Sequence, residues 1–165
     1  MVLKKNQTES SFISKDQVLN EVKGAVKDSD LEVKFIISDK GFFTGAIGPV
    51  ASNDKSVLYS RALLLSTERD LTIHNMYLCI NEECISNESR GPGPLHTTRL
   101  GPQLYYFSNL DRLDLKEGDK VHLWAYASEG ISDSLVSESV NAKWIDVGVI
   151  TVESCEAHGY WCFPN

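Results

Sequence analysis

The feature that most constrains the fold is the stretch from Leu113 to Ala127 (LDLKEGDKVHLWAYA), in which a turn leads into a strand with a strict two-residue period. Successive side chains of a strand point to opposite faces. One face is therefore apolar and consists of Val121, Leu123, Ala125 and Ala127. The other face is aromatic with polar edges and consists of His122, Trp124 and Tyr126. A strand of this kind requires a sheet around it and a core beneath its apolar face.

Much of the remaining chain has the same short period, interrupted by turns rich in Gly, Asn and Asp. The expected strands are Leu31–Ile37, Gly41–Ile47, Ser56–Ser66, Leu71–Ile80, Cys84–Ile85 and Leu104–Ser108, with one or two more in Val140–Val152. We interpret Thr67–Asp70 as the connection of a hairpin. Strands do not alternate with helices, which disfavours a parallel α/β sheet. The pattern predicts a mainly β fold, an antiparallel Greek-key β-sandwich of about seven to eight strands, with a closed barrel as the alternative.

One helix is expected near the N-terminus. Ser14 and Gln17 form a capping-box pattern, and apolar residues follow at helical spacing, namely Val18, Leu19, Val22, Ala25 and Val26. This predicts a short amphipathic helix over about residues 15–27 that lies across an open end or face of the sheet. Residues 1–13 are polar and are expected to be flexible, and residues 153–165 form a cysteine-containing tail. At 165 residues, the whole chain is expected to be a single domain.

The charge of the chain excludes some classes of partner. The net charge is −7, whereas sequence-independent binding to nucleic acid depends on clustered Lys and Arg. An acidic protein is also not attracted to anionic lipid by its overall charge. The N-terminal residues lack the apolar run of a secretory signal, and no window approaches a membrane span. We therefore predict a cytoplasmic protein, with non-classical export left open, that does not bind nucleic acid.

Four cysteines occur as two pairs, Cys79 with Cys84 and Cys155 with Cys162. Each pair could form a disulfide that closes a short loop, or the four sulfurs could hold a zinc ion, with His158 as a substitute ligand. The spacing differs from that of common zinc knuckles, and a cytoplasmic setting disfavours stable disulfides. The sequence favours free thiols and no metal site.

The stretch Ser86–Gln103 contains three prolines and three glycines and is expected to be an irregular loop. His96 and Arg99 lie within it and are candidate ligand-binding residues. The four histidines are in four different segments, and no hydrolase, zinc-protease or nucleotide-binding motif is present. His74 and His122 lie in expected strands and are interpreted as structural. We predict no catalytic residues and no cofactor.

Aromatic residues provide the other candidate ligand-binding side chains, Trp124, Tyr126, Tyr160 and Trp161. Flat rings with a polar edge suit stacking on sugars or insertion at a lipid interface. The alternative is that strand tryptophans such as Trp124 and Trp144 fill a second core or the space beneath the helix. The leading hypothesis is a non-enzymatic, lectin-like recognition domain for a glycan or a protein partner. The alternatives are a cytolysin-like protein that acts on membrane surfaces and a self-assembling homo-oligomer.

Overall fold

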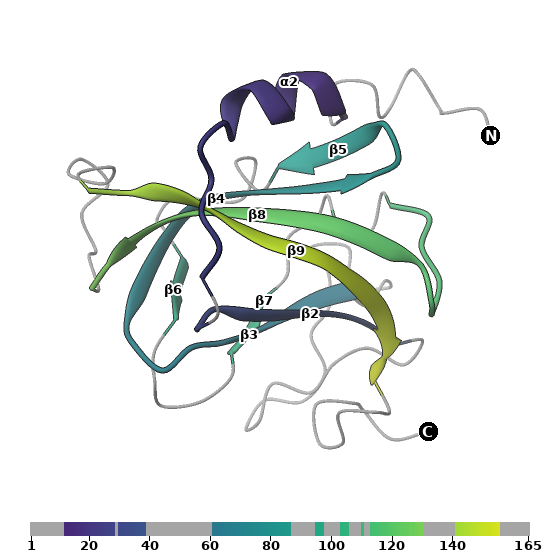
Figure 1. Ribbon diagram of the computed structural model, residues 1–165. Coiled ribbons are helices and arrows are strands. Elements are labelled where there is room, and N and C mark those ends of the chain that lie inside the picture. The colour runs from purple at the N-terminus through teal and green to yellow at the C-terminus, as the bar shows by residue number, and fades with distance from the viewer. Residues whose placement is uncertain are drawn as a thin grey trace, which may run out of the picture.

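The computed structural model describes residues 12–28, 30–38, 61–86, 95–97, 103–105, 110, 113–130 and 141–155. These form a mainly β fold with one short helix, α2 (Lys15–Glu21), as the sequence predicts (Figure 1). The described strands are β1 (Ile13–Ser14), β2 (Glu32–Ile37), β3 (Arg61–Ser66), β4 (Leu71–Ile80), β5 (Glu83–Ser86), β6 (Leu95–Thr97), β7 (Gln103–Tyr105), β8 (Lys120–Glu129) and β9 (Lys143–Ser154).

The strands form one sheet in the order β1-β5-β4-β8-β9-β2-β3-β7, with β6 paired to β4. Strand β9 joins the two parts of this sheet, because it pairs with β8 along most of its length and with β2 at its end. The sheet bends along β9, so that β2, β3 and β7 lie opposite β4 and β8 (Figure 1). The β2–β9 pair is parallel. The predicted pair of separate antiparallel sheets with Greek-key connections is therefore not confirmed in the described strands.

The main core lies between the two parts of the sheet. It contains the apolar faces of β2, β3, β4, β8 and β9, and its largest fully buried side chains include Phe35, Leu63, Leu65, Ile73, Met76, Leu78 and Leu123. The predicted alternation of β8 is confirmed, since Val121, Leu123, Ala125 and Ala127 all belong to this core. The preceding turn is also confirmed, because Gly118 adopts a φ of +95° and the Asp119 N–H donates to the Lys116 carbonyl at 3.0 Å.

The predicted hairpin between the third and fourth strands is wrong. Strand β3 pairs with β2 and β7, whereas β4 pairs with β5, β6 and β8. Thr67–Asp70 therefore crosses from one part of the sheet to the other, and we call this connection the arch. The physical reason is visible in β3, where four consecutive residues, Ala62–Leu65, are buried. A strand that is buried on both faces lacks the apolar–polar alternation of a hairpin with one solvent face, so its sequence does not show which strands it pairs with.

Helix α2 covers the outer face of the sheet, which confirms the role that was expected for it. The Ser14 hydroxyl caps the helix by accepting a hydrogen bond from the Gln17 N–H at 3.2 Å. The helix ends at Glu21, six residues before the predicted end, and the chain then passes through Gly24 with a φ of +81°. A second core lies beneath the helix and contains Val18, Val22, Tyr77, Cys79, Cys84 and Trp124.

The expectation of free thiols is wrong for the three cysteines that the structure describes. Cys79 and Cys84 lie opposite each other on β4 and β5 and form a disulfide. The turn between these strands, with Asn81 at a φ of +54°, brings the two residues together. Cys155 is also disulfide-bonded, and its partner lies outside the described residues. Within the described residues, no group of three His, Cys, Asp or Glu side chains could hold a metal ion.

The expectation of an irregular stretch over Ser86–Gln103 is wrong at three places. Ser86 ends β5, Leu95–Thr97 forms β6 against Leu71–Ile73, and Gln103 begins β7. A short strand that pairs with only one neighbour needs only a few residues. The prolines of this stretch, which lack a backbone donor, lie outside β6 and do not interrupt its pairing. In the region predicted to form one or two strands, Val140–Val152, the structure has one strand, β9, over Lys143–Ser154. The predicted strand at 41–47, the N-terminal residues 1–11 and the tail beyond Cys155 lie outside the described residues.

In the part of the chain described here, no helix has the length and apolar character needed to cross a membrane.

Candidate functional site

A groove with a volume of about 810 Å³ opens between β9 and the chain that enters and forms β2. Its two sides meet at both ends, because Val26 forms a parallel bridge with Ile145 and Phe35 pairs with Val152. Between these contacts, residues 27–34 face residues 146–151, so one side is two residues longer than the other. Figure 1 shows the chain leaving α2, crossing β9 and descending to β2. We call this opening the β2–β9 groove.

Two local features of the sequence separate the sides of the β2–β9 groove. The register of β8 and β9 shifts at Val147, where Gly148 adopts a φ of +100°, as expected for a bulge. On the opposite side, the Asp30 N–H donates to the Asp28 side chain at 3.0 Å and bends the chain before β2. A bulge on one side and a turn on the other prevent the two segments from pairing continuously.

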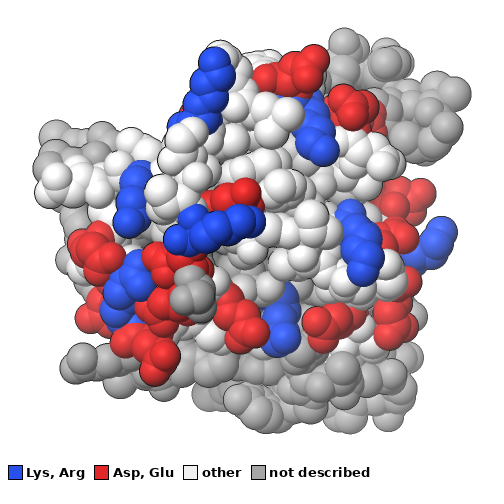
Figure 2. Space-filling model, in the orientation of Figure 1, with Lys and Arg blue, Asp and Glu red and all other residues white. Residues whose placement is uncertain are grey.

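The β2–β9 groove has an apolar floor and an acidic rim. Its apolar lining residues are Leu31, Val33, Val147 and Ile150. Six carboxylates and two lysines also line it, namely Asp28, Asp30, Glu32, Glu68, Asp146 and Glu153 with Lys27 and Lys34. Figure 2 shows acidic side chains gathered toward the lower left of the molecule, with basic side chains among them. The groove is therefore suited to a ligand that is apolar on one side and positively charged on another.

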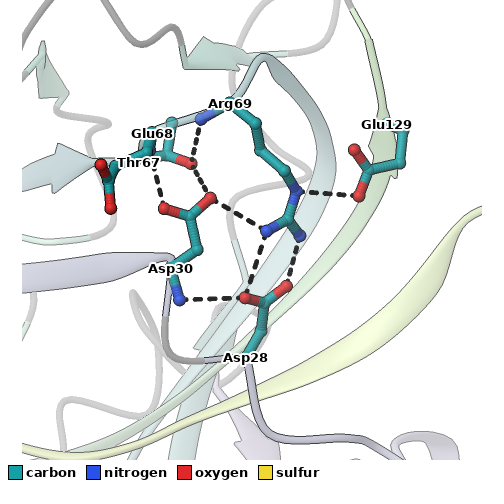
Figure 3. Close-up of polar contacts among 6 residues, drawn as sticks. All are labelled: Asp28, Asp30, Thr67, Glu68, Arg69 and Glu129. Carbon is teal, nitrogen blue, oxygen red and sulfur yellow. Dashed lines mark hydrogen bonds and ion pairs between the residues drawn. The ribbon is translucent and has the colours of Figure 1, made fainter.

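Arg69 anchors one end of the groove through three carboxylates from two segments of the chain (Figure 3). Its guanidinium contacts Asp28, bonds Asp30 with Nη1 to Oδ2 at 2.9 Å, and bonds Glu129 with Nε to Oε2 at 2.9 Å. The Thr67 hydroxyl also donates to Asp30 Oδ2 at 2.9 Å. We call these residues the Arg69 clamp. The clamp connects the arch, the chain before β2 and the end of β8.

The clamp also determines the protonation of its members. The hydrogen bond from Arg69 holds the pKa of Asp28 below its usual value, although partial burial opposes this effect. The hydrogen bond to Asp28 in turn raises the pKa of Arg69, so the guanidinium stays charged. Both groups are therefore ionised at neutral pH, and the clamp is a permanent ion-pair network there.

A second polar group lies on the β9 side of the groove. Asp146 bonds His122 Nε2 through Oδ1 at 2.8 Å, and its Oδ2 lies 3.3 Å from Lys27 Nζ. Burial raises the pKa of Asp146, but the hydrogen bond and charge of His122, together with those of Lys27, outweigh burial and lower it. The His122 ring stacks on Trp124 with the ring centroids 3.8 Å apart. These contacts support the interpretation of His122 as a structural residue.

The β9 backbone presents a strand edge inside the groove. The Val152 N–H donates to the Asp119 carbonyl at 2.8 Å, and the Gly118 N–H donates to the Val152 carbonyl at 2.9 Å. Backbone groups of successive strand residues point to alternate edges, so those of Val149 and Thr151 face the other edge, toward β2. Because the Val152 backbone bonds the β8 side, its parallel partner Phe35 pairs with the flanking residues Thr151 and Glu153, so the β2 pairing covers that edge from Thr151 onward. The backbone groups of Val149 therefore face the β2 side of β9, outside this pairing.

Of the predicted ligand-binding residues, the structure describes the side chains of Trp124 and Tyr126. The Trp124 side chain is 2% exposed in the second core, which agrees with the interpretation that it packs beneath the helix. Tyr126 is half-buried and contacts the ring of Trp144, with the centroids 5.0 Å apart. The backbone of His96 lies in β6, opposite Thr72. The His96 side chain and Arg99, Tyr160 and Trp161 lie outside the described part of the chain.

The groove was missed in the sequence because its two sides are more than 100 residues apart. One local signal was available, since Gly148 interrupts an apolar strand pattern and such a glycine commonly marks a bulge. The alternating acids of Asp28, Asp30 and Glu32 were a second, weaker signal. Comparisons with protein-family models, with characterised proteins and with solved structures find no match for this chain.

Proposed function

We propose that this chain is a non-enzymatic recognition domain that binds a protein partner in the β2–β9 groove. The supporting observation is that this groove combines an apolar floor, a charged rim and an open strand edge. Protein segments are recognised in this way, since the strand edge bonds the backbone and the pockets select side chains. His122 and Asp146 serve the groove as structural groups, because each is already bonded to a neighbour.

A protein partner is favoured over a glycan because the aromatic rings on the outer face that the structure describes contact one another. Trp144 stacks on Tyr77 with the centroids 5.2 Å apart and also contacts Tyr126. Trp124 lies beneath α2 and is stacked with His122. Sugar rings need an aromatic face that is open to solvent. The loop hypothesis for His96 and Arg99 stays a prediction.

A protein partner is also favoured over a membrane surface. The groove rim carries more carboxylates than lysines, and anionic lipid headgroups repel such a rim. The large apolar side chains exposed among the described residues are Leu19, Val26 and Val149, which come from different segments. A homo-oligomer remains the alternative, with a second copy of this chain as the protein partner.

Two further assignments accompany this proposal. A sheet that bends around one core supports a sandwich-like architecture, in which the parts of the sheet act as facing layers. The disulfide between Cys79 and Cys84, and the disulfide-bonded state of Cys155, support an oxidising compartment in place of the predicted cytoplasm. Reducing compartments keep such thiols reduced.

The test is selection from a phage-displayed library of random heptapeptides, with a glycan array and anionic liposomes probed in parallel. The selected peptides are then titrated into ¹⁵N-labelled protein. We expect shifts of the backbone amides of residues 31–34 and 146–151. Val147→Asn, which makes the groove floor polar, should weaken peptide binding about tenfold, as expected for a buried contact. Leu19→Asn, at an exposed position on α2 outside the groove, should change it less than twofold. Binding to glycans or liposomes alone, or amide shifts confined to other residues, would overturn the proposal.

A further inference from the structure

We infer that the β2–β9 groove takes an extended segment in which Lys or Arg alternates with apolar residues, and that this segment adds as a strand to the free edge of β9. This inference rests on the proposed function and names the chemistry of the partner. The length of the groove side on β9, residues 146–151, corresponds to about 20 Å of extended chain. A segment of about six residues spans this length.

The charge of the rim selects a basic segment. The two rim lysines are already paired, since Lys27 lies 3.3 Å from Asp146, and Lys34 lies 3.8 Å from Glu32 and 3.9 Å from Glu153. Glu32 and Glu68 are exposed at the mouth of the groove. Arg69 also pairs with Asp28 and Asp30, but the six carboxylates still exceed the two lysines and Arg69 together, so the groove retains negative charge after these pairs are counted. Lys or Arg side chains on a bound segment neutralise this charge.

The apolar floor and the strand edge select an extended, alternating segment. A strand directs successive side chains to opposite faces. When a segment pairs with the Val149 edge, one set of its side chains therefore points to the floor residues Leu31, Val33 and Ile150. The other set points outward past the acidic rim. A helical segment cannot satisfy the backbone groups of a strand edge, so the geometry favours strand addition.

The test uses a fluorescein-labelled peptide, Lys-Val-Lys-Val-Lys-Val, with Glu-Val-Glu-Val-Glu-Val as the charge control. Fluorescence anisotropy at low salt should give at least about tenfold tighter binding for the lysine peptide, a difference of about 1.4 kcal/mol. Two further peptides are N-methylated on the backbone, one at the nitrogens of the valines and the other at the nitrogens of the lysines. At least one should bind about tenfold more weakly, because N-methylation removes the N–H groups that pair with β9.

Matched protein variants separate the groove from the general charge of the chain. The double change Glu32→Lys and Glu68→Lys alters the rim, whereas Glu82→Lys and Glu117→Lys makes the same charge change at exposed positions outside it. The rim variant should weaken binding of the lysine peptide about tenfold, and the control variant less than twofold. Circular dichroism spectra and melting temperatures check that both variants fold.

Each remaining outcome overturns the inference in a distinguishable way. Equal effects of the two double variants, or equal binding of the two N-methylated peptides and the parent, would reject a basic strand in the groove. Equal binding of the glutamate peptide with amide shifts at residues 31–34 and 146–151 would reject the charge selection and leave the proposed function standing. Failure of the lysine peptide to bind, while a display-selected peptide shifts those amides, would also reject the basic segment and leave the proposed function standing. Binding of the lysine peptide without shifts at these residues would reject both proposals.

Discussion

The Arg69 clamp offers the sharpest test of how the tertiary structure is held together, through the substitution Arg69→Ala. The side chains of Asp28 and Asp30 are only 12% and 18% exposed, and both lose their guanidinium partner in this variant. A hydrogen bond to a charged group contributes about 1.5–3 kcal/mol when it is shielded from water. Arg69 itself is 33% exposed, so solvent screening reduces this value for each bond.

The third partner contributes little. Glu129 is 68% exposed, and an exposed ion pair is worth about 0–1 kcal/mol. Asp30 also keeps its bonds from the Thr67 hydroxyl and the Glu68 N–H in the variant. We therefore expect Arg69→Ala to lower the free energy of unfolding by about 2–4 kcal/mol at neutral pH. Lys23→Ala removes one positive charge at an exposed position and should be nearly neutral.

The assay is urea denaturation at low salt, because urea does not screen charges as guanidinium chloride does. The sign of the pH dependence follows from Asp28, whose pKa is lowered in the folded state from an ordinary value of 3.8. The stabilisation is fully present above about pH 3.8 and is lost as the pH falls through the lowered pKa. The difference in the free energy of unfolding between wild type and Arg69→Ala should therefore become smaller below this pH.

A double-mutant cycle isolates the pair, since Asp28→Asn removes the charge while it keeps the shape of the side chain. The effects of Arg69→Ala and Asp28→Asn should be non-additive by about 1–2 kcal/mol. The reasoning is refuted if the free energy of unfolding of Arg69→Ala lies within about 0.5 kcal/mol of the wild-type value at neutral pH. It is also refuted if Lys23→Ala lowers the free energy of unfolding as much as Arg69→Ala does. Additive effects in the cycle would show that Arg69 acts through other contacts.

Three further predictions concern the core, the disulfide and the helix. Leu123→Ala should destabilise the fold by about 2–5 kcal/mol, whereas the exposed Lys120→Ala should be nearly neutral; equal effects in a urea titration would show that the strand faces are misassigned. Cys79 and Cys84 should resist alkylation in denatured, unreduced protein, and reduction should lower the melting temperature; peptide mass spectrometry that finds both alkylated would contradict the disulfide. Ser14→Ala should destabilise by about 1 kcal/mol through loss of the helix cap, and Ser14→Asp should restore the wild-type melting temperature; a loss in both variants would exclude capping as the cause.

The amino-acid sequence by itself determined the local features of this fold. The alternation from Val121 to Ala127 gave the correct inner and outer faces of β8, because the pleat of a strand is a two-residue property of the backbone. Ser14 marked the helix start, since an N-cap bond spans only three residues. Gly118 marked the turn before β8, because a positive φ is a requirement of a single residue.

The tertiary structure alone decided which strands pair and where the groove lies. Thr67–Asp70 has the composition of a hairpin turn, yet β3 and β4 belong to different parts of the sheet. The parallel contacts of β9 with Val26 and Phe35 join residues more than 100 positions apart, and the groove exists only because β9 separates from the other chain between them. Local periodicity contains no information about such partners. They are selected by burial of apolar faces on both sides of a strand and by clamps such as that of Arg69, which form only when distant segments have come together.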